Sequence, residues 1–437
     1  MQKKSQSFSN FSQAIHSKGF GIRPDDEWEI KDIYQSMQKH KIIARGNGLS
    51  YSDCCVNSNQ LVIDTSRLNH ILSFDPTTGI AVCQGGVTFA DLFLLDPRFI
   101  PPVLPGTMHA TIAGGIAHDV HGKNNPKAGT LGHHIEWLLL EGSSDSFLCS
   151  RLEHTDLFYA TIAGLGLTGI IKRVAIRLNK ASPYVSTQTE QFPCIESLLQ
   201  TMQQRCQEYD YQVAWLDLIN KPRAILTVAN HMVDFHKKQR EVRWKHHPTI
   251  PKLPFRLIRP YLVKQFNRAY YHHIHPKSQM MPLWRFNNPL DAIHNWNRLY
   301  GKQGLIQFQA LFDARMALDT LNALFRIIKS HRITPILAVL KYFTESGQGL
   351  LSFARPGFTI AIDFIHNAKS REAIQDMNQL ITDLGGKIYL AKDLLLTKDQ
   401  FNSMYQEHAT FDLILSKYHS HMRSDLSKRL HIGSSQG

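Results

Sequence analysis

The chain has 437 residues, too many for one ordinary hydrophobic core, so two domains are expected. Hydrophobic residues make up 43% and charged residues 19% of a sequence without low-complexity tracts, which excludes a disordered protein, a coiled coil and a collagen-like fibre. The formal net charge is +13, and its concentration in one segment matters more than its size.

No segment has the length and hydropathy of a transmembrane helix or a secretory signal. The longest weakly polar stretch, residues 157–171, is glycine-rich and shorter than the roughly 20 apolar residues that cross a bilayer. The first 13 residues contain two lysines but no apolar core. The six cysteines lack the C-x-x-C spacing of a zinc or redox site, so we expect reduced packing residues. A soluble, cytoplasmic protein is therefore expected.

The first 180 residues alternate short β-branched runs with glycine turns. Helices are predicted at residues 89–97 and 156–163. Strands are predicted at residues 41–46, 60–66, 70–75, 79–86, 135–141, 146–150 and 169–178. This α+β order lacks regular βαβ repetition.

The composition changes after residue 180, where we place a domain boundary. Helices are predicted at residues 197–209, 315–330 and 370–384. Strands are predicted at residues 211–219, 223–231, 305–312, 335–343, 358–364 and 387–393. An antiparallel sheet covered by helices is expected for residues 181–385, with a helical segment, residues 386–437, returning to the first domain.

Two glycine-rich loops lie in the first domain. In residues 44–53, Gly46 and Gly48 allow a tight turn whose N–H groups converge on one spot, a nest for an anion. Residues 105–134 hold six more glycines, which favours close approach of the backbone to a ligand. Two such loops suggest a long ligand with a diphosphate, such as a dinucleotide, although each loop alone is compatible with an ordinary turn.

A Rossmann fold is not favoured. Asp64 lies 18 residues after Gly46, near the spacing of a ribose-binding acid, but the third glycine of G-x-G-x-x-G is missing. The residues that follow look like a loop and a strand rather than a helix.

Four motifs resemble the vanillyl-alcohol-oxidase/PCMH type of FAD-binding domain. They are R-G-N-G-L-S-Y-S-D at 45–53, V-L-P-G-T at 103–107, T-I-A-G-G-I-A-H-D-V-H-G-K-N at 111–124 and the stretch 157–171. Within that superfamily the chain is similar to the decaprenylphosphoryl-β-D-ribose 2'-oxidase family, because H-G-K-N is combined with Y-L-A-K-D at 389–393. The similarity covers roughly residues 42–430.

The resemblance implies FAD as cofactor. Some members of the superfamily attach FAD covalently through a histidine at the position of Leu49, so non-covalent FAD is expected here. The implied cofactor-binding residues are Ala44, Arg45, Gly46, Asn47, Gly48, Leu49, Ser50, Tyr51, Asp53, Gly106, Thr107, Thr111, Ile112, Ala113, Gly114, His118, His121, Gly122, Gly169, Ile171 and Tyr389. His118 and His121 lack a third ligand at suitable spacing, so no metal is expected.

Lys392 is the expected catalytic residue, together with His121 beside the flavin. Lys392 ends the apolar run K-I-Y-L-A, where an inward lysine is costly unless it has a partner or a role. Burial or a neighbouring cation would lower its pKa and suit it to act as a base. The alternatives are an exposed lysine paired with Asp393 and a purely structural histidine.

The resemblance also implies a sugar pocket. Gln307 and Gln309 share one strand face by the two-residue period. The implied substrate-binding residues are Tyr51, Lys123, Trp215, Gln307, Gln309, Lys341, Phe343, Thr359 and Lys392. Mycobacterial members place a cysteine at the position of Ala361 and an asparagine at that of Thr359, so the same sugar is not assured.

The implied activity is oxidation of a secondary hydroxyl, the 2'-OH of a polyprenylphosphoryl pentose, to a ketone with the hydride passing to flavin N5. An NAD(P)H-dependent keto-reductase would complete an epimerisation, and quinone and oxygen both remain open as electron acceptors. The alternatives are an aldonolactone or alditol oxidase acting on a soluble sugar, and a non-catalytic flavin-binding partner protein.

Residues 236–277 form a basic, aromatic-rich insertion with eleven Lys and Arg against the single acid Glu241. Nucleic-acid binding is not expected, because no nucleic-acid module accompanies the charge. A solvated loop and peripheral contact with an anionic inner membrane remain open. The resemblance favours the membrane, because the family's substrate is a lipid-linked sugar.

Overall fold

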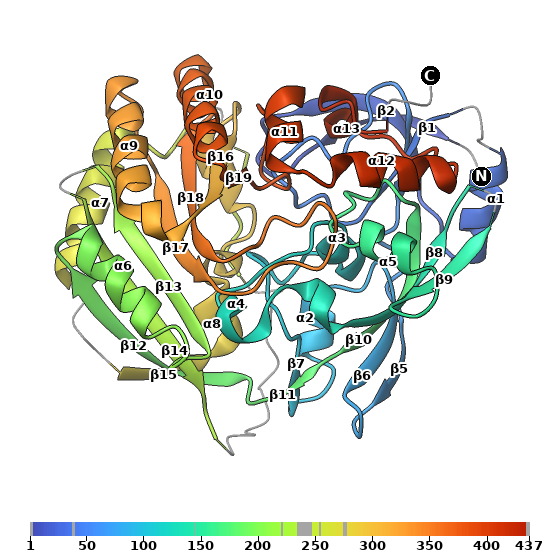
Figure 1. Ribbon diagram of the computed structural model, residues 1–437, viewed down its shortest axis with the longest axis horizontal. Helices are drawn as coiled ribbons and strands as arrows, with labels where there is room; N and C mark the ends of the chain where they lie inside the picture. The colour runs from blue at the N-terminus through green and yellow to red at the C-terminus, as the bar shows by residue number, and fades with distance from the viewer. Residues whose placement is uncertain are drawn as a thin grey trace.

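The computed structural model describes residues 3–36, 40–143, 145–219, 222–233, 247–252, 255–273 and 278–433. The strands of these residues form four sheets, of four, five, two and eight strands. In Figure 1 the eight-stranded sheet and its helices lie on the left, and the smaller sheets lie on the right with the C-terminal helices above them. The predicted α+β fold class is confirmed.

The first sheet has the order β1 (Lys4–Ser9), β2 (His16–Ile22), β4 (Leu61–Asp64) and β3 (Ile42–Arg45), and β4 is parallel to both of its neighbours. The second sheet is antiparallel, in the order β5 (Ile71–Asp75), β6 (Ile80–Gln84), β10 (Ile170–Arg177), β8 (Ile135–Glu141) and β9 (Ser146–Ser150). β7 (Phe99–Ile100) and β11 (Asn179–Lys180) form a short antiparallel two-stranded sheet. The helices here are α1 (Trp28–Ser36), α2 (Phe89–Phe93), α3 (Ile112–Ala117), α4 (Asn125–Ala128) and α5 (Thr155–Thr161).

The eight-stranded sheet is antiparallel throughout. Its order is β15 (Ser278–Pro282), β12 (Tyr184–Phe192), β14 (Arg223–His231), β13 (Tyr211–Asp217), β17 (Leu337–Phe343), β18 (Gly357–Ile365), β16 (Leu305–Phe312) and β19 (Lys387–Ile388). The helices α6 (Ile195–Gln204), α9 (Ala317–Ser330) and α10 (Ala368–Asp383) cover one face, as Figure 1 shows. The opposite face is turned toward the glycine loops.

The C-terminal helices α11 (Lys398–Met404), α12 (His408–Lys417) and α13 (Asp425–Arg429) lie over the first sheet (Figure 1). Met422 bridges to Ile42 of β3, and the Arg423 N–H donates to the Ile42 carbonyl at 2.7 Å. Before it reaches these helices, the chain adds β19 to the edge of the eight-stranded sheet. The predicted domain limits at residues 180 and 385 stay a prediction.

The predicted strand at 387–393 is wrong beyond Ile388. The backbone turns after that residue, and the Lys392 N–H donates to the Tyr389 carbonyl at 2.9 Å. Lys392 therefore lies in a turn, where the chain crosses from the eight-stranded sheet to the C-terminal helices.

The basic insertion is described only in part. Residues 236–246, 253–254 and 274–277 of it lie outside the described residues. The rest contains α7 (Pro260–His273), a helix that the composition did not predict. Among the described residues, no helix is both long and apolar enough to cross a membrane.

Candidate active site

A cavity of about 520 Å³ lies between the two glycine loops and the open face of the eight-stranded sheet. The first loop contributes residues 44–51, the second contributes residues on both sides of α3, and β16, β17 and β18 contribute the opposite wall. The turn after β19 contributes Tyr389, Ala391 and Lys392.

Most of the predicted site residues line this one cavity. They are Ala44, Arg45, Gly46, Asn47, Gly48, Leu49, Ser50, Tyr51, Gly106, Thr107, Thr111, Ala113, Gly114, His118, His121, Gly169, Ile171, Gln307, Gln309, Lys341, Tyr389 and Lys392. Residues more than 300 positions apart in the sequence thus meet at one site.

Seven predicted residues do not line the cavity. They are Asp53, Ile112, Gly122, Lys123, Trp215, Phe343 and Thr359. Phe343 and Thr359 lie directly behind lining residues, since Phe343 packs on the His121 ring at 4.9 Å and Thr359 receives a hydrogen bond from Gln309 at 3.4 Å. Lys123 is buried elsewhere: its Nζ donates to the Phe286 carbonyl at 2.7 Å, and burial lowers its pKa to about 7. Asp53 is an ion-pair partner of Arg429.

The two glycine loops approach each other too closely for larger side chains. A Cβ on Gly46 would lie 2.3 Å from Oγ1 of Thr111, which caps α3 by accepting a hydrogen bond from the Gly114 N–H. Gly48 has a φ of +64°, a conformation that favours glycine. Asn47 ties the loops together by donating to the His109 carbonyl at 2.8 Å. The result is a preformed cradle of closely packed backbone that lines the cavity, which fits a long ligand with a diphosphate such as FAD.

Arg45 lines the cavity, but its guanidinium is engaged in holding the first loop. Its guanidinium donates to the Cys55 carbonyl at 2.9 Å and to the Ser9 carbonyl at 2.7 Å. This side chain therefore supports the cradle from behind.

His121 lies at the base of the cavity, enclosed by aromatic rings of Phe343, Phe353 and Tyr389 with centroids 4.9–5.5 Å away. Burial, Lys341 and Lys392 hold the pKa of His121 well below its usual value, so the imidazole is neutral. The Gln309 Nε2 amide donates to Nε2 of His121 at 3.1 Å, which assigns the imidazole proton to Nδ1 of His121. That Nδ1 is buried and has no acceptor among the described residues, so it suits a carbonyl or ring nitrogen of a bound cofactor.

Lys392 is positioned by the first loop. The Tyr51 N–H and the Ser50 hydroxyl both donate to the Ala391 carbonyl, at 3.1 and 2.8 Å. Lys392 Nζ lies 3.4 Å from the centroid of the Tyr51 ring. Burial lowers the pKa of Lys392 to about 7, an effect that Asp363 opposes and Lys341 reinforces. The alternative of an exposed Lys392 paired with Asp393 is not what the structure has, because Asp393 pairs with Arg429 at 2.9 Å.

Asp363 is a cavity residue that was not predicted. It is only 2% exposed, receives hydrogen bonds from Gln307 and Tyr300, and has its pKa raised to about 6 by burial. Lys341 lies on the neighbouring strand, and burial lowers its pKa to about 8. Asp363 could have been predicted from the sequence, because it is an acid inside the apolar run F-T-I-A-I-D-F. The same kind of signal predicted Lys341, a lysine inside the apolar run L-A-V-L-K-Y-F.

Cys54 is a second cavity residue that was not predicted, and it pairs with the predicted His118. Both line the cavity, with Cys54 Sγ 3.2 Å from His118 Nε2, while His118 Nδ1 contacts the Gly114 carbonyl at 2.9 Å. Cys54 is thus held by side chains rather than by apolar packing alone.

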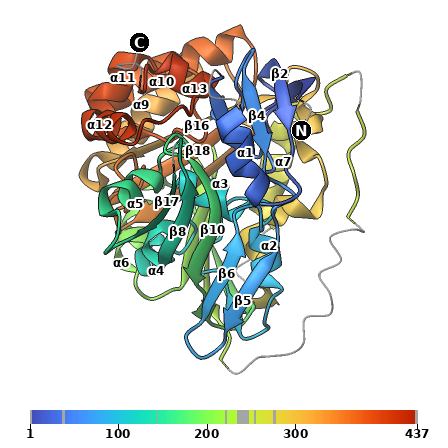
Figure 2. The same cartoon turned by 90° about the vertical axis from the view of Figure 1, so that its right-hand side faces the viewer.

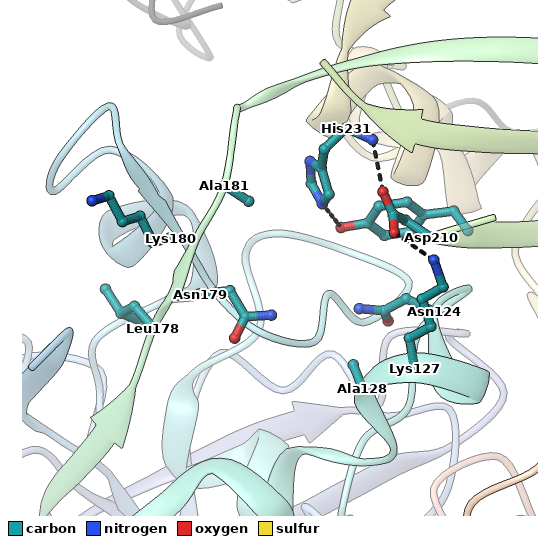
Figure 3. Close-up of a pocket in the computed structure, with 10 residues that line it drawn as sticks. Asn124, Lys127, Ala128, Leu178, Asn179, Lys180, Ala181, Asp210 and His231 are labelled. Atoms are coloured by element: carbon teal, nitrogen blue, oxygen red, sulfur yellow. Dashed lines mark hydrogen bonds and ion pairs between the residues drawn. The ribbon is translucent and has the colours of Figure 1, made fainter. Parts of the chain in front are cut away.

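A separate cavity of about 330 Å³ lies beside β11, β13 and β14. Figure 3 shows that Lys127, Asp210 and His231 in its lining already bind one another. Lys127 pairs with Asp210 at 3.0 Å, and the His231 N–H donates to the same carboxylate at 2.8 Å. Only part of the second glycine loop, within residues 124–128, reaches it, and neither the first loop nor Lys341 and Lys392 line it.

Comparisons with known proteins agree with these features. Residues 20–140 match the family model described as an FAD binding domain. The chain is 30% identical to the decaprenylphosphoryl-β-D-ribose oxidase of Mycolicibacterium smegmatis over 382 residues, 83% of each chain. It is 30% identical over 161 residues to a candidate D-arabinono-1,4-lactone oxidase of Neurospora crassa, 36% of this chain and 29% of that protein. It is also 26% identical to the mitochondrial D-2-hydroxyglutarate dehydrogenase of Rattus norvegicus, over 36% of this chain and 31% of that protein.

Proposed function

The chain belongs to the decaprenylphosphoryl-β-D-ribose oxidase family of FAD-dependent oxidoreductases, and we propose that it oxidises the 2'-OH of a polyprenylphosphoryl pentose to a ketone. FAD, when bound, supplies the acceptor for the hydride at its N5 atom. The chain's own residues bind the sugar, orient the hydroxyl and take its proton. The similarity over 83% of both chains, with the buried lysine at the wall opposite the glycine loops, supports the proposal.

Lys392 carries the proposed chemistry. Loss of a hydride from a carbinol requires the hydroxyl proton to leave as the C–H bond breaks, so a base must lie at the hydroxyl. A lysine with a pKa of about 7 has a substantial neutral fraction at physiological pH and accepts that proton directly. Asp363 then stabilises the ammonium that results.

Gln307, Gln309 and Lys341 are the proposed sugar contacts. They project from neighbouring strands of the same sheet face as Asp363, so they form a wall of donors around the hydroxyl. His121 is proposed to position the cofactor through Nδ1. We propose that FAD is bound non-covalently, because Leu49 stands where other members of the superfamily have the attaching histidine. Release of FAD into the supernatant on acid precipitation would agree with this.

The test uses the variant Lys392→Ala, reconstituted with FAD. We expect it to retain flavin absorbance and to lose rapid flavin reduction by a polyprenylphosphoryl ribose, by roughly 10²–10⁴-fold, the usual contribution of general base catalysis. Stopped-flow absorbance under anaerobic conditions measures the rate. Lys398→Ala, at an exposed lysine of α11, is the control and should reduce its flavin normally. Unimpaired reduction in Lys392→Ala would remove Lys392 from the mechanism.

A soluble sugar acid lactone is the second candidate substrate, favoured by the similarity to the candidate D-arabinono-1,4-lactone oxidase. That similarity covers 36% of the chain, against 83% for the lipid-linked sugar oxidase. Bleaching of the flavin by a free lactone or polyol, and not by the lipid-linked ribose, would establish this alternative. As partners we propose an NAD(P)H-dependent keto-reductase, which would complete an epimerisation, and the inner membrane surface.

A further inference from the structure

Helix α7 exposes an apolar stripe. Leu262, Phe266 and Tyr270 recur every four residues, so they lie on one side of the helix, and they are 54%, 60% and 37% exposed. Val263 and Asn267 are the residues of α7 that are buried against the body of the protein. A contiguous exposed stripe of this kind marks an interaction surface more often than scattered apolar residues do.

The segment that contains α7 carries only positive charge. Residues 247–273 contain no Asp or Glu. Their cations are Lys252, Arg256, Arg259, Lys264 and Arg268, all of them exposed. A second copy of the chain would bring like charges together at this surface. A nucleic acid would match the charge but has no need of a Leu–Phe–Tyr stripe, whereas an anionic bilayer matches both.

The helix borders the candidate active site. Tyr270 contacts the Trp215 ring at 4.9 Å, and Trp215 pairs in register with Val339, a cavity residue. The segment before α7 is joined to the cavity wall as well, because Leu257 and Ile258 donate backbone hydrogen bonds to Leu299 in the 3₁₀ turn Trp296–Tyr300, and Trp296 lines the cavity. Figure 2 shows α7 on the side of the molecule opposite to α11 and α12.

We infer that α7 is a membrane-interface helix that docks the mouth of the cavity on an anionic lipid surface. Leu262 and Phe266 insert among the acyl chains at the interface, and the cations of residues 252–268 contact lipid phosphates. A lipid-linked sugar then reaches the cavity while its tail stays in the bilayer. The purpose of the docking rests on the proposed function, whereas the docking itself does not.

The test measures co-sedimentation of the FAD-loaded protein with substrate-free vesicles. We expect binding to vesicles of phosphatidylcholine with 30% phosphatidylglycerol (about 0.3 mole fraction), weakened by salt, and little binding to phosphatidylcholine alone. The double variant Lys264→Gln/Arg268→Gln should bind roughly 30-fold more weakly, since each cation near an anionic surface contributes about fivefold. The double variant Leu262→Ser/Phe266→Ser should bind the anionic vesicles roughly tenfold more weakly, or weaker still. The matched controls are Lys369→Gln/Lys398→Gln for charge and Leu413→Ser, at a 72% exposed leucine of α12, for apolar surface.

Equal loss in the controls, or no binding of the wild type to anionic vesicles, would overturn the inference. So would tighter binding to an oligonucleotide duplex than to vesicles, or salt-independent self-association through the stripe. Flavin reduction by a short-chain, water-soluble polyprenylphosphoryl ribose separates the two proposals. If α7 variants no longer bind vesicles but still reduce their flavin with this substrate, both the membrane docking and the proposed function are supported. If the wild type binds vesicles but its flavin is not reduced, only the proposed function is overturned.

Discussion

Two charged neighbours and burial set the chemistry at Lys392. Asp363 favours its protonated form, Lys341 disfavours it, and burial lowers its pKa to about 7. Lys392 is therefore poised between its neutral and protonated forms at physiological pH, which suits the proposed role of a group that takes a proton and later returns it to solvent.

The rate of flavin reduction should follow the neutral fraction of Lys392. Because the neutral amine is the base, the rate rises with pH and levels off above a midpoint near pH 7. Stopped-flow reduction at a series of pH values measures the midpoint. A rate that falls over this range would contradict the assignment.

Two variants should move this midpoint in opposite directions. Asp363→Asn removes the carboxylate that stabilises the ammonium, so the midpoint shifts to lower pH. Lys341→Gln removes a cation that destabilises the ammonium, so the midpoint shifts to higher pH. The same pH series provides the measurement, and midpoints that shift together would show that a different group titrates.

The sequence identified the cations of the site better than its acid. Lys341 and Lys392 stand out because a lysine in an apolar run is costly. Asp363 stands in an equally apolar run, yet its partner Lys392 is 29 positions away and approaches only because the turn after β19 brings it there. Long-range pairing of this kind has no local signal.

At the scale of elements, a buried ion cluster anchors α13 to the active-site loops. Arg429 of α13 contacts Asp53 at 2.8 Å and Asp393 at 2.9 Å, and it donates to the Leu396 carbonyl at 2.8 Å. Asp53 lies two residues after Tyr51, and Asp393 directly follows Lys392. The cluster therefore holds together the two segments that carry the cation–ring contact.

Arg429→Leu should lower the free energy of unfolding by about 3 kcal/mol, since it leaves two nearly buried carboxylates without a cation. Urea denaturation followed by circular dichroism measures the change. Arg315→Leu, which breaks an exposed pair with Asp313, should cost less than about 1 kcal/mol. Equal losses in both variants would show that the cluster has no special role.

Strong apolar strands were predictable, and polar ones were not. The strands β8, β9, β14 and β16 have the predicted limits because each contains a short, mainly apolar run with polar residues or turns beside it. β12, Y-V-S-T-Q-T-E-Q-F, was missed because most of its residues are polar and only the pairing with β14 and β15 makes it a strand. α7 was missed because its segment was interpreted by its charge and aromatic content, as a basic insertion, and not by its periodicity.

At the scale of the whole molecule, the cavity is walled by both the glycine loops and the large sheet. Bound FAD should therefore stabilise the two regions together. At a free concentration 100 times its Kd, FAD should add about 2.7 kcal/mol to the free energy of unfolding. Differential scanning calorimetry with and without FAD measures the shift. Two separate transitions, of which only one moves, would contradict this coupling.

The hydrogen bonds from Ser50 and Tyr51 to the Ala391 carbonyl span about 340 residues of sequence. A ribosome finishes the cofactor loops early but releases the turn that completes the cavity only near the end of synthesis. Contacts this distant in sequence form late, because the ordering of the intervening chain must come first. During translation we therefore expect the glycine cradle to exist for a long time without its far wall, and flavin to be captured by the nearly complete polypeptide rather than by the nascent first domain.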